Sequence, residues 1–214
     1  MRSVLAYVGA SWDEAGFDAT LAAHTAAPAA QLIPHMGSPL LSDHRHGVHI
    51  SQMPAILSYL GEQYGLYAVE PAKRALCNKV IGDANDVLYE MTRHNGAQMW
   101  TKRSWSTYQP RLRRWMAIFE ETGRRHGLTA QSGFLLDTSQ PCLADLVTAT
   151  LWGTMIAKLT PLRPVLDAHA PNIAGLSDRI GAMPSQVALR IQSDASYDDA
   201  WCGGQIEASL RAVI

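Results

Sequence analysis

The stretch Val48-His-Ile-Ser-Gln-Met-Pro-Ala-Ile-Leu-Ser-Tyr-Leu60 decides the fold of the N-terminal part of the chain. It begins as a short extended run and changes after Ser51 to the spacing of an amphipathic helix. Pro54 falls in the first turn of that helix, where a missing N–H costs little. We expect a strand that leads directly into a helix ending near Gly65. The residues that this helix should bury are Ile56, Leu57 and Leu60.

A second extended run precedes this stretch and completes a hairpin. Pro39-Leu-Leu is extended in pattern, and the turn-like segment Ser42-Asp-His-Arg-His-Gly47 separates it from Val48. The segment from Gly65 to Pro71 has the composition of a linker. Mixed strand and helix signals therefore precede the linker, which predicts an α/β domain over residues 1 to 66.

The chain after the linker is predicted to be helical throughout. From about residue 72 apolar residues recur at helical spacing, which indicates an all-helical domain over residues 72 to 192. A tail over residues 193 to 214 carries a loop-like segment at 198 to 204. The apolar positions that define the helices are Leu76, Val80, Val87, Leu88, Met91, Leu112, Trp115, Met116, Phe119, Leu143, Leu146, Val147 and Leu151.

Composition excludes several classes of protein. The 214 residues include 18 basic and 19 acidic side chains, and the charged share is 17% against about 25% in ordinary domains. This balance argues against a disordered chain and against a nucleic-acid partner. Three cysteines without a CxxC pair support neither a disulfide framework nor a cysteine zinc site, so we expect a cytoplasmic protein. No apolar run approaches the length of a membrane span.

The N-terminus allows two registers. In the first, Ser3 to Val8 is a strand that ends close to Tyr7, whose hydroxyl could then serve a reaction. In the second, Arg2 to Gly9 is the end of a helix, and Trp12 to Asp18 leads into a strand. Short apolar runs are ambiguous between helix and strand, so the pattern alone does not choose.

Five motifs in order resemble the cytosolic glutathione S-transferase family. The first is the hairpin and helix from Ser38 to Leu60, which Gly65-Leu-Tyr67 continues. The resemblance covers roughly residues 2 to 192. The other motifs are similar to the first long helix of the family's helical domain, its capping box and its closing helix: Ala75 to Asp86, Phe134-Leu-Leu-Asp with Cys142-Leu-Ala-Asp145, Ala170 to Ile180, and Met183-Pro184.

The resemblance implies a thioredoxin-like α/β domain over residues 1 to 66 and an all-α domain over residues 72 to 192. Gly9-Ala-Ser-Trp12 is similar to the family segment that ends the first helix and opens the second strand, which favours the second register. The first strand and the start of the first helix would then lie upstream of Met1. The catalytic residue of the family belongs to that part, so the resemblance leaves it unassigned here.

Five residues match the family's glutathione-binding positions. Ser38 and Pro39 match a residue and a cis-proline that present backbone groups to the peptide part of glutathione. Gln52 and Met53 match the positions that hold its γ-glutamyl end, although the family usually has Ser or Thr where Met53 stands. Met53 has no hydroxyl to donate to the γ-glutamyl end, and losing this hydrogen bond to a charged group weakens glutathione binding by about 1.5 to 3 kcal/mol. Asp86 matches an acidic residue that reaches the glutathione amine from the neighbouring subunit.

The function that the resemblance implies is transfer of the glutathione thiolate to a small hydrophobic electrophile. Glutathione is the co-substrate, no metal is expected, and a residue supplied by the neighbour implies a homodimer. The alternative is a binding or structural protein of the same fold without catalysis, which the substitution at Met53 favours. A glutathione-dependent reductase would need an active-site cysteine in the first domain, and no cysteine precedes Cys77.

Other clusters are better explained by structure than by chemistry. His44, His46 and His49 are interpreted as a solvated hairpin tip rather than a metal site. The basic side chains Arg111, Arg113 and Arg114 are interpreted as the polar face of an amphipathic helix. Asp145 takes the third place of a capping box, but Cys142 is a poor cap, so Thr138 or Ser139 is expected to replace it. The helix end that lines the electrophile pocket in the family carries Tyr89, Met91, Arg93 and Trp100, of which Met91 is expected in the core.

Overall fold

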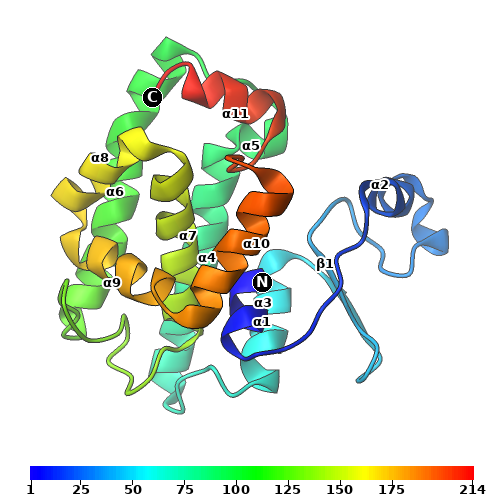
Figure 1. Cartoon of the computed structure of the whole chain (residues 1–214), viewed down its shortest axis with the longest axis horizontal. Coiled ribbons are helices and arrows are strands. Elements are labelled where there is room, and N and C mark those ends of the chain that lie inside the picture. The colour runs from blue at the N-terminus through cyan, green and yellow to red at the C-terminus, as the bar shows by residue number, and fades with distance from the viewer. The chain divides into compact units, whose positions relative to one another are not determined.

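The computed structural model describes residues 1–214 and consists of two compact units (Figure 1). The first unit runs from Met1 to Leu66 and the second from Tyr67 to Ile214. The first unit mixes helices with strands, whereas the second contains helices only. The order of an α/β part followed by an all-α part is therefore as predicted.

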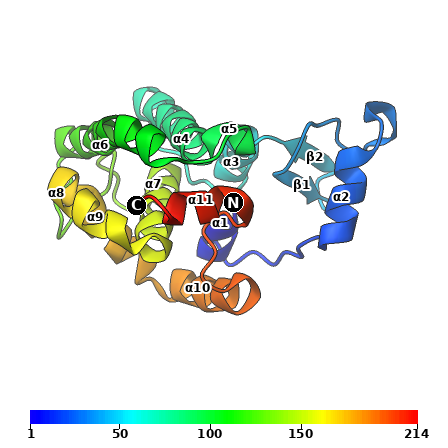
Figure 2. The ribbon, with the colours of Figure 1, turned by 90° about the horizontal axis from the view of Figure 1, so that it is seen from above.

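The first unit contains three α-helices, one turn of 3-10 helix and a two-stranded antiparallel sheet (Figure 2). The predicted hairpin is confirmed, because Leu40 pairs with Ser51 and Asp43 pairs with Val48. Gly47 adopts a φ of 65° in the connecting turn, which glycine does at no steric cost. The elements are α1 (Arg2–Tyr7), α2 (Phe17–Thr25), η1 (Pro28–Ala30), β1 (Leu40–Asp43), β2 (Val48–Ser51) and α3 (Met53–Gln63).

Helix α3 follows β2 almost without a connection, as the sequence predicts. Its first backbone hydrogen bond runs from the Ile56 N–H to the Gln52 carbonyl at 3.0 Å. Gly65, with a φ of 64°, lies just beyond the end of the helix. The predicted side chains Ile56, Leu57 and Leu60 are buried.

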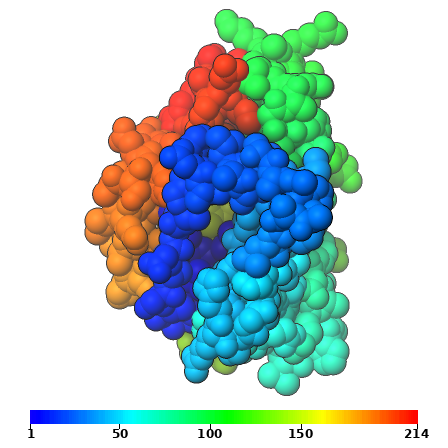
Figure 3. All heavy atoms as spheres, turned by 90° about the vertical axis from the view of Figure 1, so that its right-hand side faces the viewer, coloured from blue at the N-terminus to red at the C-terminus, as the bar shows by residue number.

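The strand predicted from Trp12 to Asp18 is wrong, although the helix predicted before it is confirmed. Residues 11 to 16 have no regular structure, and Phe17 begins α2. The Thr20 N–H donates to the Gly16 carbonyl at 3.0 Å, which starts the helix instead. A strand needs a neighbour to satisfy its backbone groups, and the sheet consists of β1 and β2 alone. Helix α2 buries no side chain, and Figure 3 shows it at the surface of its unit.

The second unit is a helical bundle built around α7. Figure 1 shows α7 enclosed by other helices, and its closest neighbours are α9 and α4. Trp152 of α7 is fully buried, and its ring meets that of Phe119 edge to face at 5.5 Å. Eleven of the 16 residues of α7 are buried, so this helix forms the centre of the core of the unit. The elements are α4 (Pro71–Met91), α5 (Arg93–Gly96), α6 (Lys102–Arg125), α7 (Leu143–Lys158), η2 (Thr160–Leu162), α8 (Arg163–His169), α9 (Pro171–Gly181), α10 (Pro184–Tyr197) and α11 (Gly204–Arg211).

Helix α7 is capped by Asp145 together with Cys142. The Asp145 carboxylate accepts hydrogen bonds from the N–H groups of Leu135, at 2.6 Å, and Cys142, at 2.9 Å. The expectation that Thr138 or Ser139 would replace Cys142 at the cap is wrong, because Cys142 itself is the N-cap residue. The hydrogen bond from the Cys142 N–H to the Asp145 carboxylate holds Cys142 at the N-cap, although its side chain has no hydroxyl.

None of the helices combines the length and the apolar character needed to span a membrane.

Candidate functional site

The hairpin brings four of the five predicted glutathione-binding residues to one end of the sheet. Leu40 and Ser51 are the last paired residues at this end. Ser38 and Pro39 directly precede Leu40, and Gln52 and Met53 directly follow Ser51. Antiparallel pairing therefore places the two segments side by side. Asp86 lies on α4 and belongs to the second unit.

The segment before β1 presents unused backbone groups. The peptide bond between Ser38 and Pro39 is cis, as the resemblance predicts. Ser38 is exposed and makes no hydrogen bond within the chain. Its N–H and C=O are therefore free to pair with an extended peptide, in the way that a strand is added to a sheet edge.

The start of α3 suits an anion. The N–H groups of Met53 and Ala55 lie in the first turn, where a helix offers no partner, and the positive end of the helix dipole points outward there. Gln52 has φ 73° and ψ 121°, a conformation that residues other than glycine rarely adopt. Its amide is exposed and unpaired, so it can bind a polar group next to the helix end. Met53 offers the site only its backbone.

Asp86 is exposed on α4 and makes no hydrogen bond or ion pair. The nearby carboxylate of Glu90 is occupied instead. It accepts from Arg111 Nε at 2.9 Å and from Trp115 Nε1 at 2.9 Å. Burial acts to raise the pKa of Glu90, but these donors outweigh it and hold the pKa below its usual value. Arg111 lies close enough to interact electrostatically with Asp86, but its hydrogen bonds go to Glu90.

The histidine-rich hairpin tip is organised by Asp43. Its carboxylate accepts from Tyr59 Oη at 2.6 Å and pairs with His46 Nδ1 at 2.9 Å. The hydrogen bond to Asp43 is the main cause that raises the pKa of Tyr59 to about 12. His49 Nδ1 pairs with Ser42 Oγ at 3.1 Å, and no group of side chains in the chain could hold a metal ion. The tie from Tyr59 to Asp43 could not be found from spacing, because it joins a strand to a separate helix.

The three cysteines are not placed for nucleophilic chemistry. Cys77 and Cys142 are buried, and the hydrogen bond of the Cys142 thiol with Cys77, together with burial, raises the pKa of Cys142 far above its usual value. Burial also raises the pKa of the Cys202 thiol to about 11. A thiol becomes a nucleophile when its pKa falls, so these shifts oppose reactivity.

The predicted amphipathic character of α6 is confirmed. The exposed guanidinium groups of Arg111, Arg113 and Arg114 project from the opposite side to the buried residues. One face of the helix buries Trp105, Leu112, Met116 and Phe119.

The connection after α4 contains an unusual backbone. The segment labelled α5 consists of four residues with positive φ: 51° at Arg93, 60° at His94, 55° at Asn95 and 88° at Gly96. Met91 just before it is fully buried, as predicted, and Trp100 just after it is 4% exposed. No sequence signal announces this turn, because three of its four residues are not glycine.

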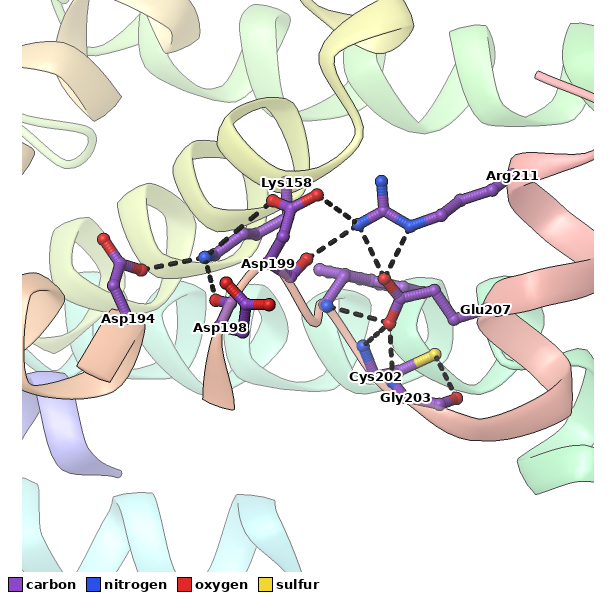
Figure 4. Close-up of polar contacts among 9 residues, drawn as sticks. Lys158, Asp194, Asp198, Asp199, Cys202, Gly203, Glu207 and Arg211 are labelled. Carbon is purple, nitrogen blue, oxygen red and sulfur yellow. Dashed lines mark hydrogen bonds and ion pairs between the residues drawn. The ribbon is translucent and has the colours of Figure 1, made fainter. Parts of the chain in front are cut away.

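The chain after α10 is held by a cluster of charged side chains (Figure 4). Lys158 Nζ donates to Asp194 Oδ1 at 2.8 Å and to the Asp198 carbonyl at 2.6 Å. Glu207 Oε2 accepts from three consecutive backbone N–H groups, at 2.6 Å to 2.8 Å, which belong to Trp201, Cys202 and Gly203. Arg211 Nε donates to Glu207 Oε1 at 2.8 Å. Sequence reasoning missed this cluster, because its partners come from three helices.

Solved structures with the same fold are glutathione S-transferases and a related synthase. A Pi-class glutathione S-transferase of Onchocerca volvulus is 17% identical, with a TM-score of 0.71 over 91% of this chain and 87% of that one. Prostaglandin synthase D of Nilaparvata lugens is 17% identical, with a TM-score of 0.65 over 89% of each chain. A search of curated protein sequences found no match.

These likenesses define the class of protein as a thioredoxin-like α/β domain joined to an all-α domain. Residues 76–213 match the sequence profile described as "Glutathione S-transferase, C-terminal domain". The chain belongs to the glutathione S-transferase family.

Proposed function

We propose that this protein conjugates the glutathione thiolate to small hydrophobic electrophiles. The observation that carries the proposal is the meeting of the cis-Pro39 segment with the start of α3. Free backbone groups on one side and an anion-binding helix end on the other match the two ends of a γ-glutamyl peptide. Glutathione is the co-substrate, and the reaction needs no metal.

Each residue has a distinct role in the proposed complex. Ser38 pairs with the peptide backbone of glutathione, and Pro39 fixes the direction of that segment. Gln52 and the Met53 N–H hold the γ-glutamyl carboxylate at the helix end. A free thiol has a pKa of about 8.5 and is mostly protonated at neutral pH, so catalysis further requires a group that stabilises the thiolate. No side chain of this chain is assigned to that step.

We place the protein in the cytoplasm as a homodimer. The exposed carboxylate of Asp86 supports this assembly, because it makes no hydrogen bond in its own chain and suits the ammonium group of glutathione. In the dimer Asp86 of one subunit completes the site of the other, with two-fold symmetry.

A glutathione titration tests the proposal. We expect heat of binding in calorimetry together with the ultraviolet absorbance of a thiolate at neutral pH. Gln52→Ala should weaken binding about tenfold or more, since it removes a hydrogen bond to a charged group. Gln205→Ala is the matched control, because Gln205 is exposed on α11 and makes no hydrogen bond.

The titration also separates the proposal from its alternative. Binding without thiolate formation would favour a glutathione-binding protein without catalysis, and the methionine at position 53 is the observation that favours this second function. Absence of binding at millimolar glutathione would contradict both.

A further inference from the structure

The basic residues of α6 recur in a regular pattern. This helix carries seven of the 18 basic residues of the chain but only two of its 19 acidic residues. Six of the seven form three adjacent pairs, which follow one another at intervals of eleven residues. Eleven residues are close to three turns of an α-helix, so the pairs return to the same side and extend over about 33 Å. All six are exposed, and we call them the basic row: Lys102, Arg103, Arg113, Arg114, Arg124 and Arg125.

The basic row lies on the side of α6 that faces away from the core. Arg114 follows the buried Trp105 by nine residues, which is about two and a half turns, so the two side chains point in opposite directions. The seventh basic residue, Arg111, is instead directed to α4, where it donates to Glu90. The basic row is therefore separate from the surface of α4 on which we propose the dimer contact of Asp86.

The fold does not account for most of these charges. The first pair lies in the first turn of α6, where the positive end of the helix dipole disfavours a cation, and no acidic residue in that turn offsets the effect. The side chains of the first and middle pairs make no hydrogen bond or ion pair. Only the last pair has a partner, because its two guanidinium groups share the carboxylate of Glu121. The basic row therefore keeps a net positive charge that nothing within the chain neutralises.

We propose that the basic row docks on the surface of an anionic phospholipid membrane. Five of its six members are arginines, whose planar fork matches the oxygens of a lipid phosphate. Clusters of about four to eight basic residues on an amphipathic helix are typical of binding to anionic headgroups. Outside α6 the chain has 17 acidic and 11 basic residues, so an anionic surface attracts α6 and repels the remainder. This asymmetry orients the protein with α6 toward the lipid.

The shape and composition of this face favour a lipid surface over a protein or a nucleic acid. Stable protein interfaces are built around large apolar and aromatic anchors. A row on one side of a helix meets a planar surface along its whole length, whereas a nucleic-acid duplex curves away from it. The exposed positions between the basic pairs offer no large apolar side chain, since they include Ser106, Thr107, Pro110 and Ala117.

This surface goes beyond the proposed function, because it needs neither glutathione nor an electrophile. The test is sedimentation of the full chain with large vesicles of phosphatidylcholine, either alone or with about one third phosphatidylserine. We expect the anionic vesicles to bind the protein about tenfold or more tightly than the neutral ones at low ionic strength, and added salt to release it. The double variant Arg103→Gln, Arg114→Gln should lose about tenfold or more of this affinity, because each basic residue near the surface contributes to it.

The double variant Arg45→Gln, Arg190→Gln is the matched control, because it changes the net charge equally. Both arginines are exposed outside the basic row, and their side chains make no hydrogen bond. This control should bind the anionic vesicles as the unaltered protein does.

Equal binding to the two kinds of vesicle, or an equal loss in the two double variants, would overturn the proposal. So would binding to duplex DNA without binding to the anionic vesicles, which would assign the basic row to a nucleic acid. If thermal melting shows that the α6 variant does not fold, Arg114→Gln decides alone, and unchanged binding in that variant overturns the site.

Discussion

Met53 is the residue at which the proposed glutathione site offers least to its ligand. It contributes a backbone N–H at the start of α3, but its side chain cannot donate a hydrogen bond. The affinity of the site should therefore be limited at this single position.

Met53→Ser should tighten glutathione binding about tenfold. A serine hydroxyl adds a hydrogen bond to a carboxylate, which contributes about 1.5 to 3 kcal/mol. Calorimetry with both proteins measures the change. Met53→Ala is the control, because it shortens the side chain without adding a donor. Equal tightening in the alanine variant would show that bulk, rather than the missing hydroxyl, limits affinity.

Asp145 is a buried carboxylate whose hydrogen bonds tie the start of α7 to the preceding segment. Burial raises its pKa above the usual value, and the N–H groups of Leu135 and Cys142 offset only part of that effect. A carboxyl group whose pKa is raised on folding favours the folded state less as pH rises through that pKa. Its contribution to stability at neutral pH is therefore hydrogen bonding rather than charge.

Asp145→Ala should lower the free energy of unfolding by about 1 to 3 kcal/mol for each N–H left unpaired. Asp145→Asn should lose less, because its amide oxygen still accepts a hydrogen bond. Urea unfolding of the three proteins measures both changes. Identical losses in the two variants would mean that the negative charge itself is needed.

At the level of elements, Glu207 links the start of α11 to the loop before it. Burial acts to raise its pKa, yet three backbone N–H groups and Arg211 hold the pKa below the usual value. The stabilisation is present above the pKa of the unfolded chain, near about 4.3, and is lost as pH falls through the lower folded value.

Glu207→Gln should remove this acid dependence. In the unaltered protein the amides of Trp201, Cys202 and Gly203 should be protected from hydrogen exchange at pH 7 and lose protection on acidification. The variant should show weak protection at every pH, after correction for the intrinsic exchange rate. Glu62→Gln on α3 serves as the control. Equal protection in the Glu207 variant would show that the carboxylate does not hold the loop.

Elements with a strong period could be predicted from the sequence, and elements set by distant contacts could not. The hairpin, α3, α4, α6, α7 and α9 follow from alternation or helical spacing together with turn residues. The predicted strand at Trp12 failed because pairing, rather than local pattern, decides whether a short run is extended. The turn at Arg93 has positive φ at three residues that are not glycine, and the contact from Lys158 to Asp194 joins residues that are distant in the chain.

In the proposed site, too, some features could be predicted from the sequence and others could not. The side-by-side placement of Ser38 and Gln52 could be predicted, because a hairpin fixes its own register. The cis peptide bond before Pro39 could be predicted only from the family resemblance, because most peptide bonds before proline are trans. The left-handed turn at Arg93 and its contact with the Trp100 ring could not be predicted, because neither has a signal in the spacing of residues.

For the whole molecule, the proposed homodimer would make the affinity for glutathione depend on protein concentration. Asp86→Asn should weaken glutathione binding without changing the mass of the particle in solution, because it removes a charge from the partner's site rather than from the fold. Calorimetry and light scattering measure the two quantities. Asp83→Asn is the control, since Asp83 is on the same helix and already pairs with Lys79. A monomer at micromolar concentration would contradict the shared site.

The burial of most of α7 has a consequence for the synthesis of the chain. The helix emerges from the ribosome before α9, its most extensive neighbour, because α9 follows it in the chain. At about 5 to 20 residues per second, the apolar surface destined for α9 waits for seconds in the nascent chain. Molecular chaperones that bind exposed apolar segments should therefore bind the nascent chain at α7, and the yield of the protein in cells should depend on them more than on any residue of the proposed glutathione site.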